Sequence, residues 1–472
     1  MYVLIFFVIK LVLAEWETVE VPEVGTIRGL ITEDIVQFKG IRYAEAPPRF
    51  QPVKSYNRYD TPVDANNETS CFQAPSSLIP VLVEDCLVLN IYKPKGNSSG
   101  LRPVLIKIHG FFTFETDQSP GNLGLLDQFW ALKWIKEFII HFNGNPDLIT
   151  IYGQSAGAAS VGYLMDSKLT RGNETYKLFH RAIASSGDNL AGWTINLSAK
   201  DQSQQFVAAC NCSDGTVDEQ LICLQKINSS SIFDIANNIS FYGVPSNQAN
   251  TISPEFVMVP MHPQEVDPET RSRVPLLLGT NMDDGSVIFS RYFNQFIKPN
   301  RSHEDPKFLQ NKFIQNMLNS SNFGILDKPI GMHETVISSF LKEARMATKF
   351  AEMTPYVSNI FSTYYFKAPA LHKAMSHAKE IGVAHGDELH YLFKFDDQPY
   401  NDTEKAISSK MIGIFYSFMR FGIPSGWTKT KAPHWPEVTE DSFPYLRIDI
   451  NDTLGAHYGS TFHCQHGQDV GK

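Results

Sequence analysis

Residues 148–157 read LITIYGQSAG, and this short stretch decides how the chain is interpreted. Its first five residues are apolar or β-branched, which predicts a buried strand, and the small residues from Ala156 to Met165 predict a helix. Between them lies the pattern Gly-x-Ser-x-Gly, whose glycines permit a sharp turn that holds Ser155 above a sheet. The alternative is an ordinary Gly/Ser turn, but the strand before it and the helix after it favour a nucleophilic serine.

The rest of the chain continues this alternation of short apolar runs and helical patterns. Further buried strands are predicted at residues 104–108, 274–278 and 360–366. Apolar residues at helical spacing predict helices over residues 124–140 and 404–421. Together they predict an α/β fold with a mostly parallel central sheet flanked by helices. Aromatic residues are expected in its core at 361–366 and 415–421.

Composition excludes several classes of protein. The chain has 472 residues, of which 43% are hydrophobic and 19% charged, so a large core can form. A net charge of −9 gives no reason to bind nucleic acid. His372, His377 and His390 lack ligand spacing with cysteines or carboxylates, so we expect no metal and no other cofactor.

The first residues predict export. Residues 2–14 read YVLIFFVIKLVLA, an apolar run too short to span a bilayer and followed by polar Glu15. We interpret residues 1–14 as a signal peptide, the alternative being a buried strand, and residues 15–472 as a single domain of a secreted protein. No other window holds 18 uncharged apolar residues, so no membrane span is expected.

Glycosylation motifs agree with export. The chain has eleven Asn-x-Ser/Thr motifs, where chance gives roughly four. Asn211 sits between two cysteines and is the least suitable. The other ten are predicted glycosylation sites: Asn67, Asn97, Asn173, Asn196, Asn228, Asn238, Asn300, Asn319, Asn401 and Asn451.

A serine hydroxyl becomes a nucleophile only beside a base that an acid orients. In folds with this turn the chain order is serine, acid, histidine. Asp284 follows the apolar run 276–278, and His385 lies in the glycine-flanked loop 382–388. The separations are 129 and 101 residues, so the fold must bring the three side chains together.

Taken together, these motifs resemble those of the type-B carboxylesterase/cholinesterase family, which has the α/β-hydrolase fold. The similarity covers nearly the whole mature chain and includes residues 38–44, 84–90, 121–128, 145–157, 279–285 and 385–389. The form GQSAG with His385 and Glu388 is also similar to juvenile hormone esterases and other invertebrate carboxylesterases.

The resemblance implies particular roles for particular residues. It implies a catalytic triad of Ser155, Asp284 and His385, with Asp where the family usually has Glu. It also implies disulfides between Cys71 and Cys86 and between Cys212 and Cys223. Cys210 and Cys464 remain, either as thiols or joined to each other. Trp193 would line an acyl pocket, although simple packing is an equal interpretation.

The sequence departs from the family in one region. The family's His-Gly-Gly-Gly run supplies backbone N–H donors to the reacting carbonyl oxygen, but this chain reads His109-Gly110-Phe111-Phe112. We expect Gly110, Phe111 and Ala156 to be the donors. Only eleven residues separate Gly110 from Asn122, where the family has a further strand, so the chain looks as if it lacks an internal strand region.

The most favoured function is therefore a secreted serine carboxylic-ester hydrolase that uses an acyl-enzyme. Gln154 is neutral where many relatives carry Glu, which favours neutral, fairly apolar esters over cationic ones. Two alternatives remain open: a non-catalytic cholinesterase-like adhesion or binding protein, and an inactive, truncated isoform of an esterase. The altered loop at Gly110 is the observation that supports them.

Overall fold

The computed structural model describes residues 15–72, 82–96, 100–107, 119–171, 177–239, 244–248, 252–267, 270–281, 283–294, 298–299, 349–370, 373, 392, 400–424, 445–447 and 453–455. They group into two compact units, each assembled from three stretches of chain. The first unit comes from residues 1–102, 130–146 and 206–241, and the second from 103–129, 147–205 and 242–472. The predicted signal peptide, residues 1–14, lies outside the described residues.

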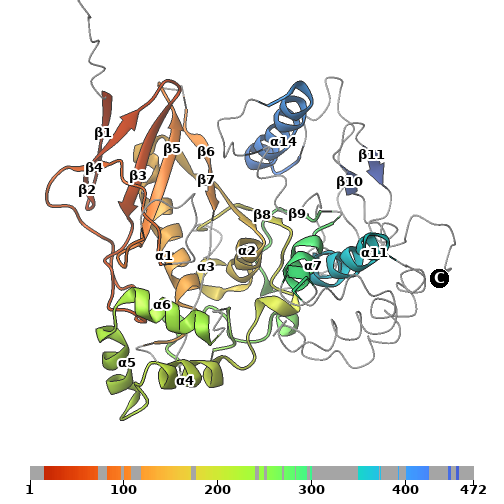
Figure 1. Cartoon of the computed structure of the whole chain (residues 1–472). Coiled ribbons are helices and arrows are strands. Elements are labelled where there is room, and N and C mark those ends of the chain that lie inside the picture. Colours follow the sequence, from red (N-terminus) through yellow and green to blue (C-terminus); the bar gives the residue numbers. More distant parts are fainter. Residues whose placement is uncertain are drawn as a thin grey trace, which may run out of the picture. The chain divides into compact units, whose positions relative to one another are not determined.

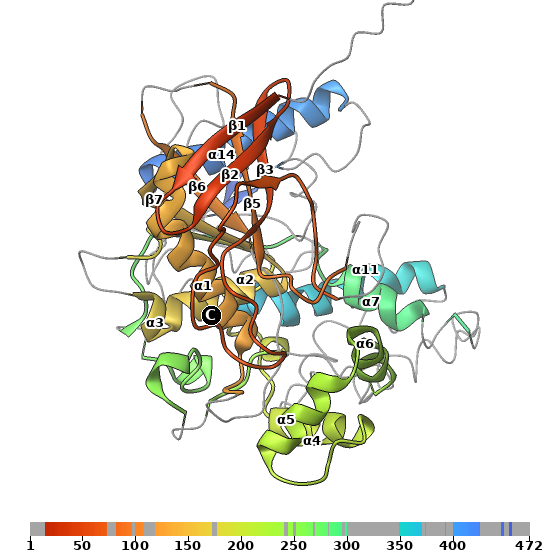
Figure 2. The same cartoon turned by 90° about the vertical axis from the view of Figure 1, so that its left-hand side faces the viewer.

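The first unit is built on a mainly antiparallel sheet (Figures 1 and 2). Its strands are β1 (Glu15–Val21), β2 (Gly25–Ile31), β3 (Ile35–Arg42), β4 (Val63–Ala65) and β5 (Val88–Pro94). The order is β1-β2-β3-β5, and β4 pairs with β2 in parallel. Alternate residues of β3 are buried, as expected of a sheet with one covered face.

Aromatic side chains form the core below this sheet. The ring of Phe38 in β3 meets that of Phe142 edge-on, with the ring centres 5.0 Å apart. Trp134 is fully buried and packs on both Phe138 and Phe142. These residues come from the second half of α1 (Leu123–Phe138) and the 3-10 turn η1 (Ile139–Phe142). Asn143 ends the turn in a left-handed conformation, which asparagine tolerates better than most residues.

Three short helices complete the first unit. They are α4 (Ala199–Ala209), whose last turns belong here, α5 (Val217–Lys226) and α6 (Ser229–Asn238). Disulfides join Cys71 to Cys86 and Cys212 to Cys223, the two pairs that the resemblance implies. Cys210 is a buried free thiol, and Cys464 lies outside the described residues.

Arg49 ties two parts of this unit together. Its guanidinium pairs with the Glu84 carboxylate, with Nε 2.7 Å from Oε1. The same group donates to the carbonyl oxygens of Leu224 and Ile227 at the end of α5. A cation at a helix C-terminus satisfies the last carbonyls, so Arg49 fixes α5 against the segment next to Cys86.

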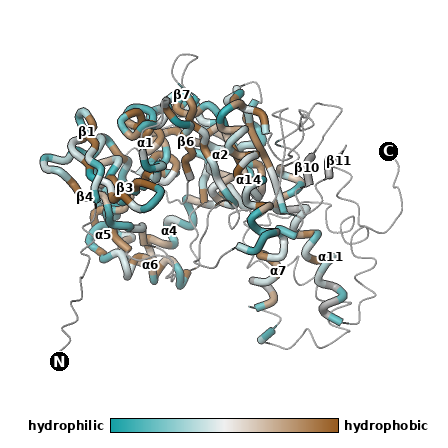
Figure 3. Tube along the Cα trace, turned by 90° about the horizontal axis from the view of Figure 1, so that it is seen from above, coloured by the Kyte–Doolittle hydropathy of each residue, from teal (hydrophilic) through white to brown (hydrophobic). Residues whose placement is uncertain are grey.

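The second unit contains a four-stranded sheet of order β6-β7-β8-β9. Its strands are β6 (Arg102–Lys107), β7 (Gly144–Gln154), β8 (Arg181–Ser185) and β9 (Leu276–Gly279), and β7, β8 and β9 run parallel. They confirm the strands predicted at 104–108, 148–152 and 274–278. Figure 3 colours the trace by hydropathy, and hydrophobic residues occur along β6 and β7.

Helices surround this sheet. They are α2 (Ala156–Asp166), α3 (Lys168–Arg171), α7 (Ser286–Tyr292), α11 (Phe350–Ser362), the π-helical η11 (Thr363–Lys367) and α14 (Asp402–Phe421). Shorter elements are the 3-10 turns η2 (Gly192–Thr194), η3 (Pro254–Phe256) and η4 (Pro263–Glu265), and the pair β10 (Tyr445–Arg447) and β11 (Thr453–Gly455). Helix α14 confirms the helix predicted over residues 404–421; Asn401 caps its start, and Gly422, in a left-handed conformation, ends it.

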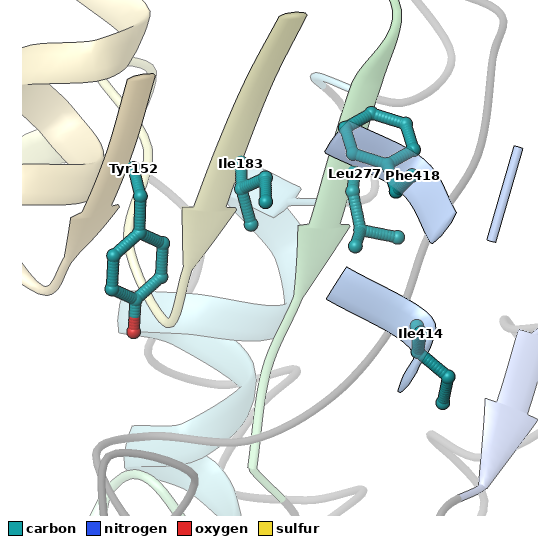
Figure 4. Close-up of a cluster of buried hydrophobic side chains, with 5 residues drawn as sticks. All are labelled: Tyr152, Ile183, Leu277, Ile414 and Phe418. Carbon is teal, nitrogen blue, oxygen red and sulfur yellow. The ribbon is translucent and has the colours of Figure 1, made fainter. Parts of the chain in front are cut away.

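The core of the second unit lies between the sheet and α14. Figure 4 shows Tyr152, Ile183 and Leu277, one from each of β7, β8 and β9, together with Ile414 and Phe418 of α14. All five are at least 96% buried. Residues at equivalent positions of neighbouring strands face the same side, so one helix covers three strands.

Two predictions for this unit are wrong. Residues 360–366 form no strand: α11 runs through Ser362 and the π-helical η11 continues it. A short apolar run fits a buried helix as well as a buried strand, which explains the error. Phe361, Tyr365 and Phe366 are buried as expected, but Phe421 is 63% exposed and not part of the core.

Candidate active site

The turn at Ser155 is strained and depends on two glycines. Ser155 has φ 57° and ψ −122°, a conformation that costs a non-glycine residue on the order of 1–3 kcal/mol. A Cβ on Gly153 would lie 2.0 Å from the Gly157 carbonyl oxygen, and one on Gly187 would lie 2.4 Å from the Ser155 carbonyl oxygen. Only glycine fits at both positions, so the local sequence dictates the turn.

Backbone hydrogen bonds fix Ser155 between strand and helix. Its N–H donates to the Ser185 carbonyl of β8 at 2.9 Å, and its carbonyl accepts from Ala158 and Ala159 in the first turn of α2. The Ser155 residue is half-buried, and Ala156 beside it is exposed. The first N–H groups of a helix have no partner within it and favour negative charge, so the Ala156 N–H can act as a donor here.

Asp284 leaves the same edge of the sheet. Gln154, Ser185 and Gly279 stand in register at the carboxyl ends of β7, β8 and β9. Ser155 follows β7 directly and the Asp284 loop follows β9, two strands away. Two strand spacings amount to about 10 Å, which leaves width for an imidazole ring between the two chain segments.

The Asp284 carboxylate is buried and oriented by its own loop. The residue is 2% exposed, and its Oδ2 accepts from the Asn281 N–H at 2.8 Å. The next residue, Gly285, donates its N–H to the Ser362 hydroxyl on α11 at 2.7 Å. Sequence reasoning missed Ser362, which is 77 residues from Gly285 and belongs to no recognisable motif.

A network of buried charges lies at the far end of α2, the helix that begins after Ser155. The Asp166 carboxylate, at the end of α2, accepts from Asn189 and lies near Arg271 and Lys373. Burial raises the pKa of Asp188 to about 6, against the opposing effect of Lys373. Two carboxylates and two cations balance the charge, so this network ties the loop after β8 to the end of α2 through Asn189 and Asp166.

Trp193 packs within the second unit. Its indole N–H donates to the Tyr365 carbonyl at 3.0 Å, and its ring centre lies 6.1 Å from that of Phe366. This contact fits the packing interpretation of Trp193. Lys367, at the end of η11, has a pKa lowered by burial, an effect that the nearby charge of Asp283 opposes.

The remaining predicted site residues divide between described and undescribed parts of the chain. Ser155, Ala156 and Asp284 come to one sheet edge, whereas His385, Gly110 and Phe111 lie outside the described residues. Within the described part, no group of three or more His, Cys, Asp or Glu residues could hold a metal ion. No helix in that same part is long and apolar enough to cross a membrane.

The described glycosylation motifs differ in how their amides are used. Asn228 and Asn401 cap α6 and α14 through Oδ1, which accepts the N–H of Ser231 and Glu404 respectively. A glycan is attached through Nδ2, which these caps do not use. Asn196 instead donates Nδ2 to Gln202 at 2.9 Å. Asn67 and Asn238 are exposed, and Asn97, Asn173, Asn300, Asn319 and Asn451 lie outside the described residues.

Comparison with known proteins agrees with the geometry. A model of the Carboxylesterase family matches residues 16–110, 108–381 and 372–465. Carboxylesterase 1C of Mus musculus is 25% identical over 441 residues, covering 80% of this chain and 75% of that protein. Cocaine esterase of Homo sapiens is 27% identical over 430 residues (79% and 73%), and acetylcholinesterase of Leptinotarsa decemlineata is 25% identical over 535 residues (89% and 81%).

Two of these findings concern the length of the chain. The alignment with the acetylcholinesterase is longer than the 472 residues of this chain, so that protein has segments with no counterpart here. The first two matched parts of the family model meet at residues 108–110. This is the region in which we expect the chain to be shorter than the family pattern.

Proposed function

Since the chain belongs to the carboxylesterase family and is a carboxylic-ester hydrolase, we propose that it works through an acyl-enzyme formed on Ser155. The observation that carries this proposal is the strained Ser155 turn on the same sheet edge as the buried Asp284. A serine held in a costly conformation at a helix N-terminus is the arrangement that nucleophilic catalysis needs.

Each residue has a distinct part in the proposed reaction. The Ser155 hydroxyl attacks the ester carbonyl carbon while the His385 imidazole accepts its proton. Asp284 orients the imidazole and stabilises its charged form. The N–H groups of Ala156, Gly110 and Phe111 bind the oxygen as it becomes anionic. His385 returns the proton to the leaving alcohol, and water then releases the acid from Ser155.

The surroundings of Ser155 favour neutral, fairly apolar esters. Gln154 is half-buried next to the nucleophile and carries no charge. A carboxylate at that position would attract a cationic substrate, and here that attraction is missing. We therefore propose a preference for neutral, fairly apolar esters, because Gln154 stands where a carboxylate would favour cationic ones.

Secretion and glycosylation are also part of the proposal. The two disulfides, Cys71–Cys86 and Cys212–Cys223, support secretion, because such bonds form and persist in oxidising compartments. The caps formed by Asn228 and Asn401 leave their amide nitrogens outside the helix hydrogen bonds. We infer that these exposed motifs carry glycans more readily than the half-buried Asn196.

Hydrolysis of a chromogenic short-chain ester by the purified full-length protein tests the mechanism. We expect Ser155→Ala to lower the rate at least roughly 10³-fold, and Ser290→Ala, at an exposed serine of α7, to leave it unchanged. An organophosphate should label Ser155 covalently. Equal rates for the wild-type and Ser155→Ala proteins would exclude the mechanism, and labelling without turnover would favour the inactive isoform.

A further inference from the structure

The residue after Asp284 is bonded to a helix far away in the sequence. The Gly285 N–H donates to the Ser362 hydroxyl at 2.7 Å, and that hydroxyl donates to the Ser358 carbonyl at 2.9 Å. Ser362 is fully buried on α11. A Cβ on Gly285 would lie 2.3 Å from both the Ser358 carbonyl oxygen and the Ser362 nitrogen, so the loop rests directly on this helix.

This chain of hydrogen bonds has only one arrangement. A serine hydroxyl has a single proton, and that of Ser362 is directed to the Ser358 carbonyl. Its lone pairs therefore remain for the Gly285 N–H. Since a buried N–H without an acceptor is costly, the loop cannot rotate on α11 without breaking this bond.

The bond bears directly on the orientation of the acid. Two backbone N–H groups near Asp284 are anchored. The Asn281 N–H donates to the Asp284 Oδ2, and the Gly285 N–H donates to the Ser362 hydroxyl. The first bond sets the carboxylate within its loop, and the second sets the loop against the rest of the second unit. Together the two bonds favour one direction of the carboxylate at the sheet edge.

We propose that Ser362 is a positioning residue, whose hydroxyl holds the Asp284 carboxylate in the direction of the catalytic imidazole. This inference rests on the proposed function, because it assigns Asp284 to the triad. If the loop turns, the carboxylate supports the imidazolium less well, and the proton transfer from Ser155 slows. Substrate binding, which uses other groups, changes little.

Three variants test the role of the hydroxyl. Ser362→Ala removes it, and Ser362→Cys replaces it with a near-isosteric but weak acceptor. Ser358→Ala is the matched control, since Ser358 is 4% exposed, lies one turn earlier on α11, and its hydroxyl has no hydrogen-bond partner among the described residues. Thermal unfolding of each variant shows whether it is folded at the assay temperature.

For Ser362→Ala we expect kcat to fall roughly 10- to 100-fold, with KM changed by less than about twofold. The acid limb of the kcat/KM profile should move to lower pH. A less well oriented Asp284 carboxylate stabilises the imidazolium less, which lowers the pKa of the catalytic imidazole. Ser362→Cys should lie between Ser362→Ala and wild type, and Ser358→Ala should keep the wild-type profile. A loss of rate in Ser358→Ala equal to that in Ser362→Ala would overturn the proposal.

Hydrogen exchange separates this inference from the proposed function. Ser362→Ala should speed exchange in the peptide containing Gly285, and Ser358→Ala should not. Faster exchange with unchanged kcat and pH profile would refute the positioning role while leaving the esterase mechanism intact. Unchanged exchange would refute the anchoring itself. An inactive wild-type protein that organophosphates do not label would overturn the proposed mechanism and, with it, the role of Ser362.

Discussion

Gly187 makes one of the closest backbone approaches around the candidate nucleophile. A Cβ there would lie 2.4 Å from the Ser155 carbonyl oxygen and 3.2 Å from the Ala158 Cβ. Backbone cannot yield as a flexible side chain does, so Gly187→Ala must displace the Ser155 turn. We expect kcat/KM for ester hydrolysis to fall roughly 100-fold, with a loss of stability of about 1–3 kcal/mol. Steady-state kinetics and thermal unfolding measure the two effects.

Gly192→Ala provides the control for this variant. Gly192 lies five residues later, and a Cβ there would meet nothing within 4 Å. It should therefore leave both activity and stability within experimental error of wild type. If Gly187→Ala retained full activity, the contact with Ser155 would not constrain the nucleophile.

At the scale of single elements, the sequence predicts best where one local pattern suffices. The glycines around Ser155, the buried run of β7 and the Gly422 end of α14 all act on nearby backbone, and the structure contains each of these elements. The helix at Phe361 was missed because a short apolar run does not by itself distinguish a buried helix from a buried strand. The Ser362 bond was also missed, because it joins α11 to a loop 77 residues earlier.

Helix α1 carries an acid whose charge the fold disfavours. Desolvation raises the pKa of Asp127 to about 7 from its ordinary value of 3.8, and no cation among the described residues offsets it. The folded state then binds the proton more tightly than the unfolded chain. The stability that Asp127 contributes is therefore fully present below about pH 4 and is lost as the pH rises from 4 through 7. Asp127→Asn should therefore stabilise the protein at pH 8 by roughly 1–3 kcal/mol, and hardly at pH 4.

Denaturant unfolding at several pH values measures this difference. Glu137→Gln is the control, because Glu137 lies on the same helix but is exposed. It should have little effect at either pH. An equal gain from Asp127→Asn at both pH values would show that the amide acts through packing, and that the buried charge is not the cause.

At the scale of the whole molecule, the short segment between Gly110 and Asn122 bears on whether the edges of the two sheets are paired. In the described part, β5 is the last strand of the first sheet and β6 the last strand of the second, so each has a strand neighbour on one side only. The outer edge of such a strand has unpaired backbone groups unless another element covers it. A parallel strand needs a crossover of a dozen or more residues, and the eleven between Gly110 and Asn122 cannot supply both.

We therefore predict that the gene encodes additional residues between the codons for Phe112 and Gly121. A transcript that includes them should yield a longer protein with an extra strand and a complete loop of oxyanion donors. Its unfolding midpoint should exceed that of the 472-residue chain by several degrees, because a strand that pairs at a sheet edge adds hydrogen bonds and buried surface. Sequencing the gene and its transcripts across this junction, followed by calorimetry of both forms, tests the prediction. If the codons for residues 112–121 form one uninterrupted exon and no longer form exists, the edge strands belong to the native protein and another element must cover them.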